Sequence, residues 1–227
     1  MTKKFLTLLI AANLCVGSHF ARAAEPAHPD QPIIPLAEAI SRLKDGNARY
    51  TNSKQQHPRQ STKERTDLTK SQHPFAIIVG CADSRVPPEI VFDQGLGDLF
   101  VLRVAGNVID DHSLGSIEYA VDHLAVRLIV VLGHQSCGAV KAAKDTIAAK
   151  SEAPAHIQSL VTAIQPAVEA TLNGDLETTV KANVKNVVQA LRSSTPVLKS
   201  KVDSGEVRVI GAYYSLDTGA VSFLDEK

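Results

Sequence analysis

The chain has 227 residues, and its 24 lysines and arginines balance 24 aspartates and glutamates, so its formal net charge is zero. This balance gives no basic field that would attract nucleic acid, and 4% aromatic residues without a tryptophan argue against a base-stacking surface. Three cysteines are too few for a disulfide framework, and no stretch of about 18 apolar residues predicts a membrane-spanning helix. The composition leaves a soluble enzyme or a binding domain.

Residues 1–23 have the three parts of a signal peptide. Lys3 and Lys4 form a positive start, Phe5–Val16 is an apolar core too short for a stable anchor, and Ala21-Arg22-Ala23 is a cleavage pattern. We therefore expect export, most simply to the periplasm, with no membrane attachment after cleavage; a retained anchor or an N-terminal helix is the alternative. Cleavage removes Cys15 and leaves the two cysteines 81 and 137.

The next part of the chain is predicted to be peripheral. Residues 24–35 are rich in proline and polar residues and are expected to form a flexible arm. Residues 36–50 predict an amphipathic helix, because apolar side chains recur at i, i+3, i+4 and i+7. Residues 51–73 are polar and are expected to be a surface connection.

From residue 75 onward, strand and helix patterns alternate. Continuous apolar runs predict three buried strands, at Phe75–Gly80, Leu99–Val104 and Arg127–Gly133. Helices are predicted at Pro87–Phe92, 113–125, 137–150, 155–171 and 176–193. Two last strands are predicted at Val207–Tyr214 and Ala220–Leu224, joined by a turn at 217–219. The pattern indicates an α/β fold: a mostly parallel central β-sheet flanked by helices, with an N-terminal helical arm and a C-terminal strand pair, in one domain over 36–227.

Two segments with reactive side chains each follow a predicted buried strand. Cys81, Asp83 and Arg85 come after the first strand, and His134 and Cys137 come after the third. Ligands of open α/β sheets bind outside the carboxyl ends of the strands, so these side chains are expected to meet there. The predicted helix that starts near Cys137 would favour a thiolate at its amino end.

Two thiolates and one imidazole are a donor set that suits zinc. Three protein ligands, Cys81, His134 and Cys137, leave a fourth position open, as in catalytic zinc sites, where the metal lowers the pKa of water toward about 7. Asp83 is expected to orient that water, or to bind the metal itself in a closed form. Pairing with Arg85 favours the first role, because it holds the carboxylate away from the metal.

Each part of this set has a simpler interpretation when taken alone. Cys81 and Cys137 in an oxidising compartment can form a disulfide in a non-catalytic protein. A zinc-binding structural or sensor module is a second alternative, although the open fourth position and the carboxylate–arginine pair argue against it. The conjunction of both segments at two strand ends favours the metal site.

The sequence resembles the β-class carbonic anhydrases. The matching segments are Gly80-Cys-Ala-Asp-Ser-Arg-Val-Pro, Gly97-Asp-Leu-Phe-Val-Leu-Arg-Val-Ala-Gly-Asn, Ser116-Ile-Glu-Tyr-Ala-Val and Val131-Leu-Gly-His-Gln-Ser-Cys-Gly. The resemblance implies reversible hydration of carbon dioxide to bicarbonate and a proton, by attack of zinc-bound hydroxide. It implies one zinc ion per chain, held by Cys81, His134 and Cys137, with Asp83 and Arg85 as the catalytic pair. Another hydrolysis at the same zinc, of a carbon disulfide-like molecule, is the alternative reaction.

The resemblance also extends to substrate and partner contacts. It implies that Gln72, Phe100, Tyr119 and the backbone N–H of Gly138 bind the substrate, with the aromatic positions contributed partly by a second subunit of a homodimer or tetramer. A family pocket valine is Ala105 here, which predicts a slightly wider pocket. The tryptophan of the bicarbonate-sensitive subtype is replaced by Ile78, which argues against that form of regulation.

Overall fold

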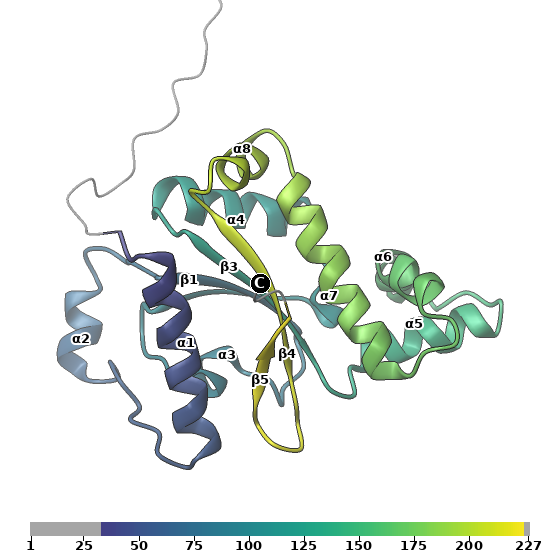
Figure 1. The fold of residues 1–227 in the computed structure, drawn as a ribbon, viewed down its shortest axis with the longest axis horizontal. Helices are drawn as coiled ribbons and strands as arrows, with labels where there is room; N and C mark the ends of the chain where they lie inside the picture. The colour runs from purple at the N-terminus through teal and green to yellow at the C-terminus, as the bar shows by residue number, and fades with distance from the viewer. Residues whose placement is uncertain (1–32, 225–227) are drawn as a thin grey trace, which may run out of the picture.

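The computed structural model describes residues 33–224, so the predicted signal peptide, most of the predicted arm and the last three residues lie outside the described part. Its centre is one five-stranded sheet with the order β2-β1-β3-β4-β5 (Figure 1). The strands are β1 Ala76–Gly80, β2 Leu99–Arg103, β3 Leu128–His134, β4 Arg208–Tyr214 and β5 Val221–Phe223. The first four are parallel and β5 is antiparallel to β4, which confirms the mostly parallel sheet and the C-terminal strand pair.

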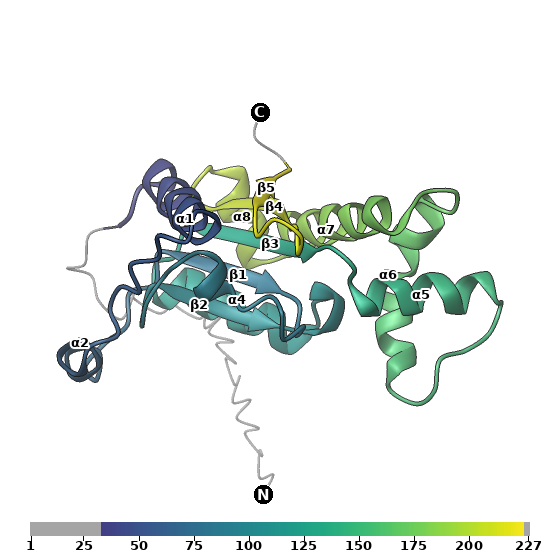
Figure 2. The same cartoon turned by 90° about the horizontal axis from the view of Figure 1, so that it is seen from below.

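Helices cover both faces of the sheet because its inner strands are apolar on both sides. Along β1, Ile77 and Val79 pack against one face with α4, α7 and α8, whereas Ile78 packs against the other face with α1 and α3 (Figure 2). The bounds of these helices are α1 Leu36–Thr51, α3 Pro88–Val91, α4 Asp111–His123, α7 Leu176–Ser193 and α8 Val197–Asp203. Leu43 of α1 is fully buried in the cluster on this second face of the sheet.

A third apolar cluster lies beyond the carboxyl ends of the strands. It joins α5 (Gly138–Ala148), α6 (Ile157–Ala170) and the first half of α7 around Val140, Ile164 and Val180. A short 3-10 turn, η1 (Ala105–Asn107), links β2 to this cluster. In Figure 2, α5 and α6 extend past the strand ends, so this layer encloses the place where the predicted ligands emerge.

The predicted strands agree with the structure to within about one residue at each end. Helix α4 begins two residues earlier than predicted because the side chain of Asp110 accepts the Ser113 N–H and caps it. The connection at 51–73 is corrected: it contains α2 (Thr62–Asp67), which starts with a capping box between Ser61 and Glu64. Helix α8 was not predicted either. Within residues 33–224, no helix combines the length and the apolar character needed to cross a membrane.

Candidate metal centre and active site

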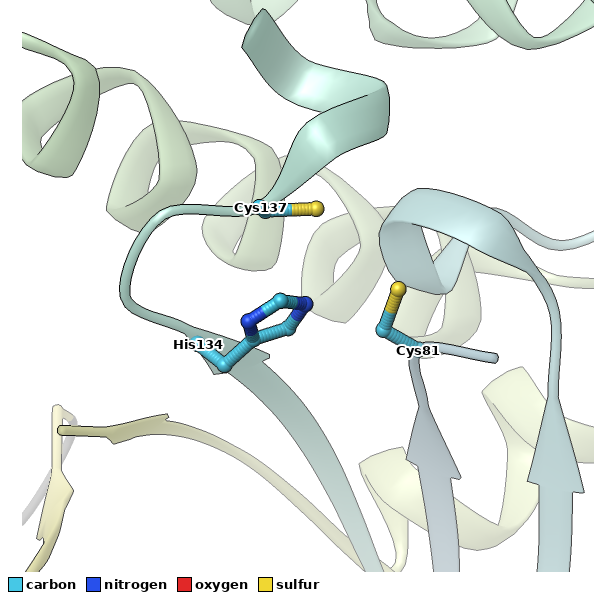
Figure 3. A group of neighbouring side chains, drawn as sticks. All are labelled: Cys81, His134 and Cys137. Carbon is cyan, nitrogen blue, oxygen red and sulfur yellow. The ribbon is translucent and has the colours of Figure 1, made fainter. Parts of the chain in front are cut away.

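The three predicted ligands come from two neighbouring strands and one helix start. Cys81 directly follows β1, His134 is the last residue of β3, and Cys137 is the N-cap of α5. Because β1 and β3 are paired, with Gly80 opposite Leu132, both strands deliver their ligands to the same edge. Figure 3 shows the three side chains pointing toward one common point.

The donor atoms of this group lie close enough together to bind one ion. The two sulfurs and the imidazole nitrogen all lie within 4.8 Å of one another, and all three residues are buried. Tetrahedral zinc, with bonds of about 2.3 Å to sulfur and about 2.0 Å to nitrogen, would separate its ligands by somewhat less than 4 Å. Both cysteines are free thiols, so the structure does not contain the disulfide considered above.

The hydrogen bonds of His134 leave one ring nitrogen available for a metal. Its Nδ1 lies 2.9 Å from the carbonyl oxygen of Gln135, and because a carbonyl only accepts, Nδ1 is the protonated nitrogen. Its Nε2 is buried and has no hydrogen-bond partner. A buried imidazole nitrogen without a partner is costly unless it binds something, and this orientation is typical of metal-binding histidines. The site therefore fits zinc.

The electrostatics of the group favour a thiolate at Cys81. A hydrogen bond from the Cys137 thiol, stronger than the opposing effect of burial, lowers the pKa of Cys81 to about 4. The same contact, together with burial, raises the pKa of Cys137. Burial opposes protonation of His134, but the nearby Cys81 sulfur and the hydrogen bond of Nδ1 to the Gln135 carbonyl raise its pKa overall. Zinc binds cysteine as the thiolate, so the lowered pKa of Cys81 suits a metal ligand.

Hydrogen bonds hold Cys81 both at its sulfur and at its carbonyl. The N–H of Gly106 in η1 donates to the Cys81 sulfur over 3.2 Å, and Asn183 of α7 donates from Nδ2 to the Gly106 carbonyl over 2.8 Å. Arg103 donates from Nε to the Cys81 carbonyl over 2.9 Å and from Nη2 to the carbonyl of Asp83. Gly106, Asn183 and Arg103 are site residues that the sequence alone did not predict.

Asp83 and Arg85 form a bidentate ion pair beside the ligands. Arg85 donates from Nε to Oδ1 over 2.9 Å and from Nη2 to Oδ2 over 2.7 Å, and its own N–H donates to Oδ1 over 2.9 Å. The side-chain hydrogen bond from Arg85 holds the pKa of Asp83 well below its usual range. Asp83 Oδ2 lies 3.9 Å from Nε2 of His134, so the carboxylate faces the metal position while the arginine holds it.

The four predicted substrate-binding residues are placed differently from one another. Gly138 is the first residue of α5, next to Cys137. Gln72 is exposed and precedes β1, so the five residues of that strand, about 16 Å of extended chain, separate it from Cys81. Phe100 lies opposite Ile77, three residues before the carboxyl end of β2, and Tyr119 on α4 is 48% exposed. The structure thus brings only Gly138 to the ligand set of the same chain.

Fold and site together define a zinc enzyme built on a parallel α/β sheet, and comparison with known proteins identifies its family. The sequence model of the family described as carbonic anhydrase matches residues 76–221. Carbonic anhydrase 2 of Mycobacterium tuberculosis is 42% identical over 186 residues, which cover 81% of this chain and 90% of the relative.

Two solved structures agree. The β-carbonic anhydrase CcaA superposes with a TM-score of 0.67 at 26% identity, covering 82% of this chain and 95% of that one. The β-carbonic anhydrase CafA of Aspergillus fumigatus superposes with a TM-score of 0.63 at 28% identity, covering 83% and 90%. The chain belongs to the β-class carbonic anhydrases. It is an enzyme of the zinc-dependent, reversible hydration of carbon dioxide, and Cys81, His134 and Cys137 form its candidate zinc site.

Proposed function

We propose that Asp83 and Arg85 are the catalytic pair of this carbon dioxide hydration, beside zinc held by Cys81, His134 and Cys137. The observation that carries the proposal is the bidentate ion pair that faces an incomplete set of three donors. When bound, zinc supplies Lewis acidity that lowers the pKa of water from about 15.7 to about 7 and so provides a nucleophile at neutral pH.

The role of Asp83 follows from its hydrogen bonds. Both of its oxygens accept hydrogen bonds from Arg85, and the lowered pKa keeps the carboxylate ionised at neutral pH. An ionised carboxylate only accepts hydrogen bonds, so Asp83 orients the attacking water and does not carry the proton away. Arg85, whose guanidinium also reaches the Ser136 carbonyl at 3.4 Å, keeps Asp83 from turning to the metal. This is the open form of the site.

Gly138 is suited to hold an oxygen of bicarbonate in the same chain. As the first residue of α5 it has an N–H that no carbonyl of the helix accepts, since the first N–H groups of any helix lack intrahelical partners. A side chain at this position would meet nothing within 4 Å, so the space in front of the backbone is open. The N–H group next to Cys137 is therefore the donor that we propose for a bicarbonate oxygen.

The rest of the pocket is proposed to come from a second copy of the chain. Gln72 precedes β1, Phe100 lies three residues before the carboxyl end of β2 and Tyr119 lies on α4, although the family resemblance places them at the substrate. Strand β2 is the edge of the sheet, and its side chains Leu99–Leu102 are only half-buried. An apolar edge strand of this kind is a surface that proteins normally cover. A homodimer, or a tetramer built from dimers, would cover it and complete both pockets.

Two further proposals concern the location of the protein and its regulation by bicarbonate. The signal peptide at 1–23 is proposed to direct export to the periplasm, which sequencing of the N-terminus of protein recovered from that compartment tests: a mature chain that starts at Ala24 supports it. Ile78, at the position of the regulatory tryptophan, is fully buried in the sheet. We propose that bicarbonate does not switch this enzyme between open and closed forms.

The test of the catalytic pair is metal analysis together with stopped-flow hydration of carbon dioxide, on the wild type and on Asp83→Asn. Asn has the same shape but loses the charge that accepts from the water, so hydration should fall about 100-fold or more. Zinc content should stay at one ion per chain, because Asp83 is not among the three ligands. Hydration at the wild-type rate in Asp83→Asn would refute the role of the pair.

A further inference from the structure

We infer that Asn183 is a positioning residue for the zinc ligand Cys81, and that it acts through the peptide backbone of Gly106. The inference rests on the zinc site of the proposed function, but not on the reaction assigned to it. Its basis is a chain of two hydrogen bonds, from Asn183 Nδ2 to the Gly106 carbonyl and from the Gly106 N–H to the Cys81 sulfur.

The first link is the contact between Gly106 and the sulfur. A buried N–H group that donates to a thiolate stabilises its negative charge and fixes its direction, as hydrogen bonds around metal ligands generally do. The donor is 3.2 Å from the Cys81 sulfur, and the hydrogen bond is buried. A shift of the η1 turn would move this N–H away from the sulfur.

The backbone conformation at position 106 strongly favours glycine. Its φ of 70° and ψ of 17° lie in the left-handed region, where a glycine has no side chain to clash. A Cβ here would lie 2.8 Å from Ile164 Cδ1 and 3.2 Å from the Cβ of Ala139, so α5 and α6 pack directly against the turn. Packing by α5 and α6 thus restrains the position of the turn, and a hydrogen bond to the Gly106 carbonyl further restrains its orientation.

Asn183 supplies a hydrogen bond to the turn from α7. It is 1% exposed, on the buried face of α7, between the apolar Val180 and Val187. A polar amide in such a stripe is unfavourable unless it is hydrogen-bonded, and its Nδ2 donates over 2.8 Å to a carbonyl 77 residues away in sequence. Helix α7 also packs on β3, the strand that carries His134. One rigid helix thus relates the Gly106 turn to the sheet.

The experiment replaces zinc by cobalt(II), whose absorption reports bonds to thiolate. Asn183→Leu keeps the size of the side chain and removes the donor. We expect its thiolate-to-cobalt band to shift and its zinc dissociation constant, measured by competition with a chelator, to rise about 10- to 100-fold. Asn183→Asp, which is isosteric but cannot donate when ionised, should change both quantities in the same direction and serves if the leucine variant does not fold.

Thr179→Val is the matched control. Thr179 is fully buried on the same helix one turn earlier and is hydrogen-bonded to Lys144 and Thr171, away from the ligands. It should lower the melting temperature without changing the cobalt band and leave the zinc dissociation constant within about twofold. The inference is overturned if Asn183→Leu and Asn183→Asp keep the wild-type band and affinity, or if Thr179→Val changes them equally. Absence of a thiolate band in the wild type would instead reject the zinc site, whereas loss of hydration alone would not affect this test.

Discussion

The two ends of the sheet have opposite characters. At the carboxyl end, three buried soft donors lie within 4.8 Å of one another and are oriented by backbone groups. At the amino end, a cavity of about 340 Å³ is lined by Phe75, Asp98 and Arg127, which directly precede β1, β2 and β3, and by Arg42 and Arg59. None of the zinc ligands lines this cavity.

The difference shows that cavity size is a poor guide to this active site. Carbon dioxide has three atoms, so its pocket need not be large, and part of that pocket is proposed to come from a second subunit. The charged groups at the amino end instead bind one another: Arg59 pairs with Asp98 over 3.1 Å, and Arg42 pairs with Glu38. Convergence of donors, rather than volume, distinguishes the two ends, and the following changes test this.

The largest effect is expected from Cys137→Ser at the carboxyl end. Serine replaces a thiolate ligand by a hydroxyl that binds zinc poorly, so bound zinc should fall to a small fraction of one ion per chain and hydration at least about 100-fold. Arg127→Ala is the control at the amino end and should leave both unchanged, with a stability change within about 0.5 kcal/mol. Metal analysis and stopped-flow assays measure both. An equal loss of zinc and of hydration in the two variants would contradict the proposed difference between the two ends of the sheet.

A matched pair of core substitutions separates stability from metal binding. Ile164→Ala and Leu43→Ala each remove a fully buried side chain, and each should cost about 2–5 kcal/mol of unfolding free energy. Ile164 packs against η1 at Gly106, whereas Leu43 of α1 belongs to another apolar cluster. Only Ile164→Ala should therefore weaken zinc binding as well. Chelator competition measures zinc binding and denaturant unfolding measures stability. The prediction is wrong if Leu43→Ala releases zinc as readily as Ile164→Ala.

Arg85→Lys tests whether geometry or charge matters in the ion pair. Lysine keeps the positive charge but cannot make the two parallel hydrogen bonds to Asp83. Hydration should fall about 10- to 100-fold while the zinc content stays unchanged. If Arg85→Lys hydrates carbon dioxide as fast as the wild type, a point charge is sufficient and the bidentate contact has no catalytic role.

The smallest effect concerns a carboxylate on the α1 and α3 side of the sheet. Asp93 is buried, which alone would raise its pKa, but hydrogen bonds from the N–H groups of Gln56 and His57 and from Arg49 lower it overall. A lowered carboxyl pKa stabilises the fold above the unfolded value of about 3.9, and this contribution is lost as the pH falls through the folded value.

Asp93→Asn should therefore cost about 1–3 kcal/mol between pH 5 and 8. The difference from the wild type should shrink as the pH drops below about 4. Thermal unfolding measured across this range tests both statements. If the stability difference between Asp93→Asn and the wild type grows on acidification, the pKa of Asp93 is not lowered in the folded protein.

The zinc ligands could be predicted from the sequence because they depend on local features. An apolar run ends at Gly80 and another at Gly133, and parallel strands bring their carboxyl ends together whatever the helices between them do. Helix α2 was also predictable from its Ser61–Glu64 capping box, but the polar character of the segment concealed it. Helix α8 has only seven residues, too few for a clear periodic pattern.

The support of the site could not be predicted in the same way. Asn183 lies in the apolar stripe of α7, and a polar residue there indicates a buried partner without naming it. Its partner Gly106 follows a different strand, and only the tertiary structure brings the two together. Gln72, Phe100 and Tyr119 could be proposed only by resemblance, because the pocket that we propose for them forms between two copies of the chain.

The pairing of β1 with β3 also has a consequence for the time course of folding. Cys81 follows β1 and His134 ends β3, with β2 and α4 between them in the chain, and such non-local parallel pairing is slow to form. Until the sheet forms, nothing holds the thiols of Cys81 and Cys137 beside His134. Because a preformed metal site rarely exists in an unfolded chain, zinc binding at this site is coupled to folding, and its binding free energy adds to the stability of the sheet.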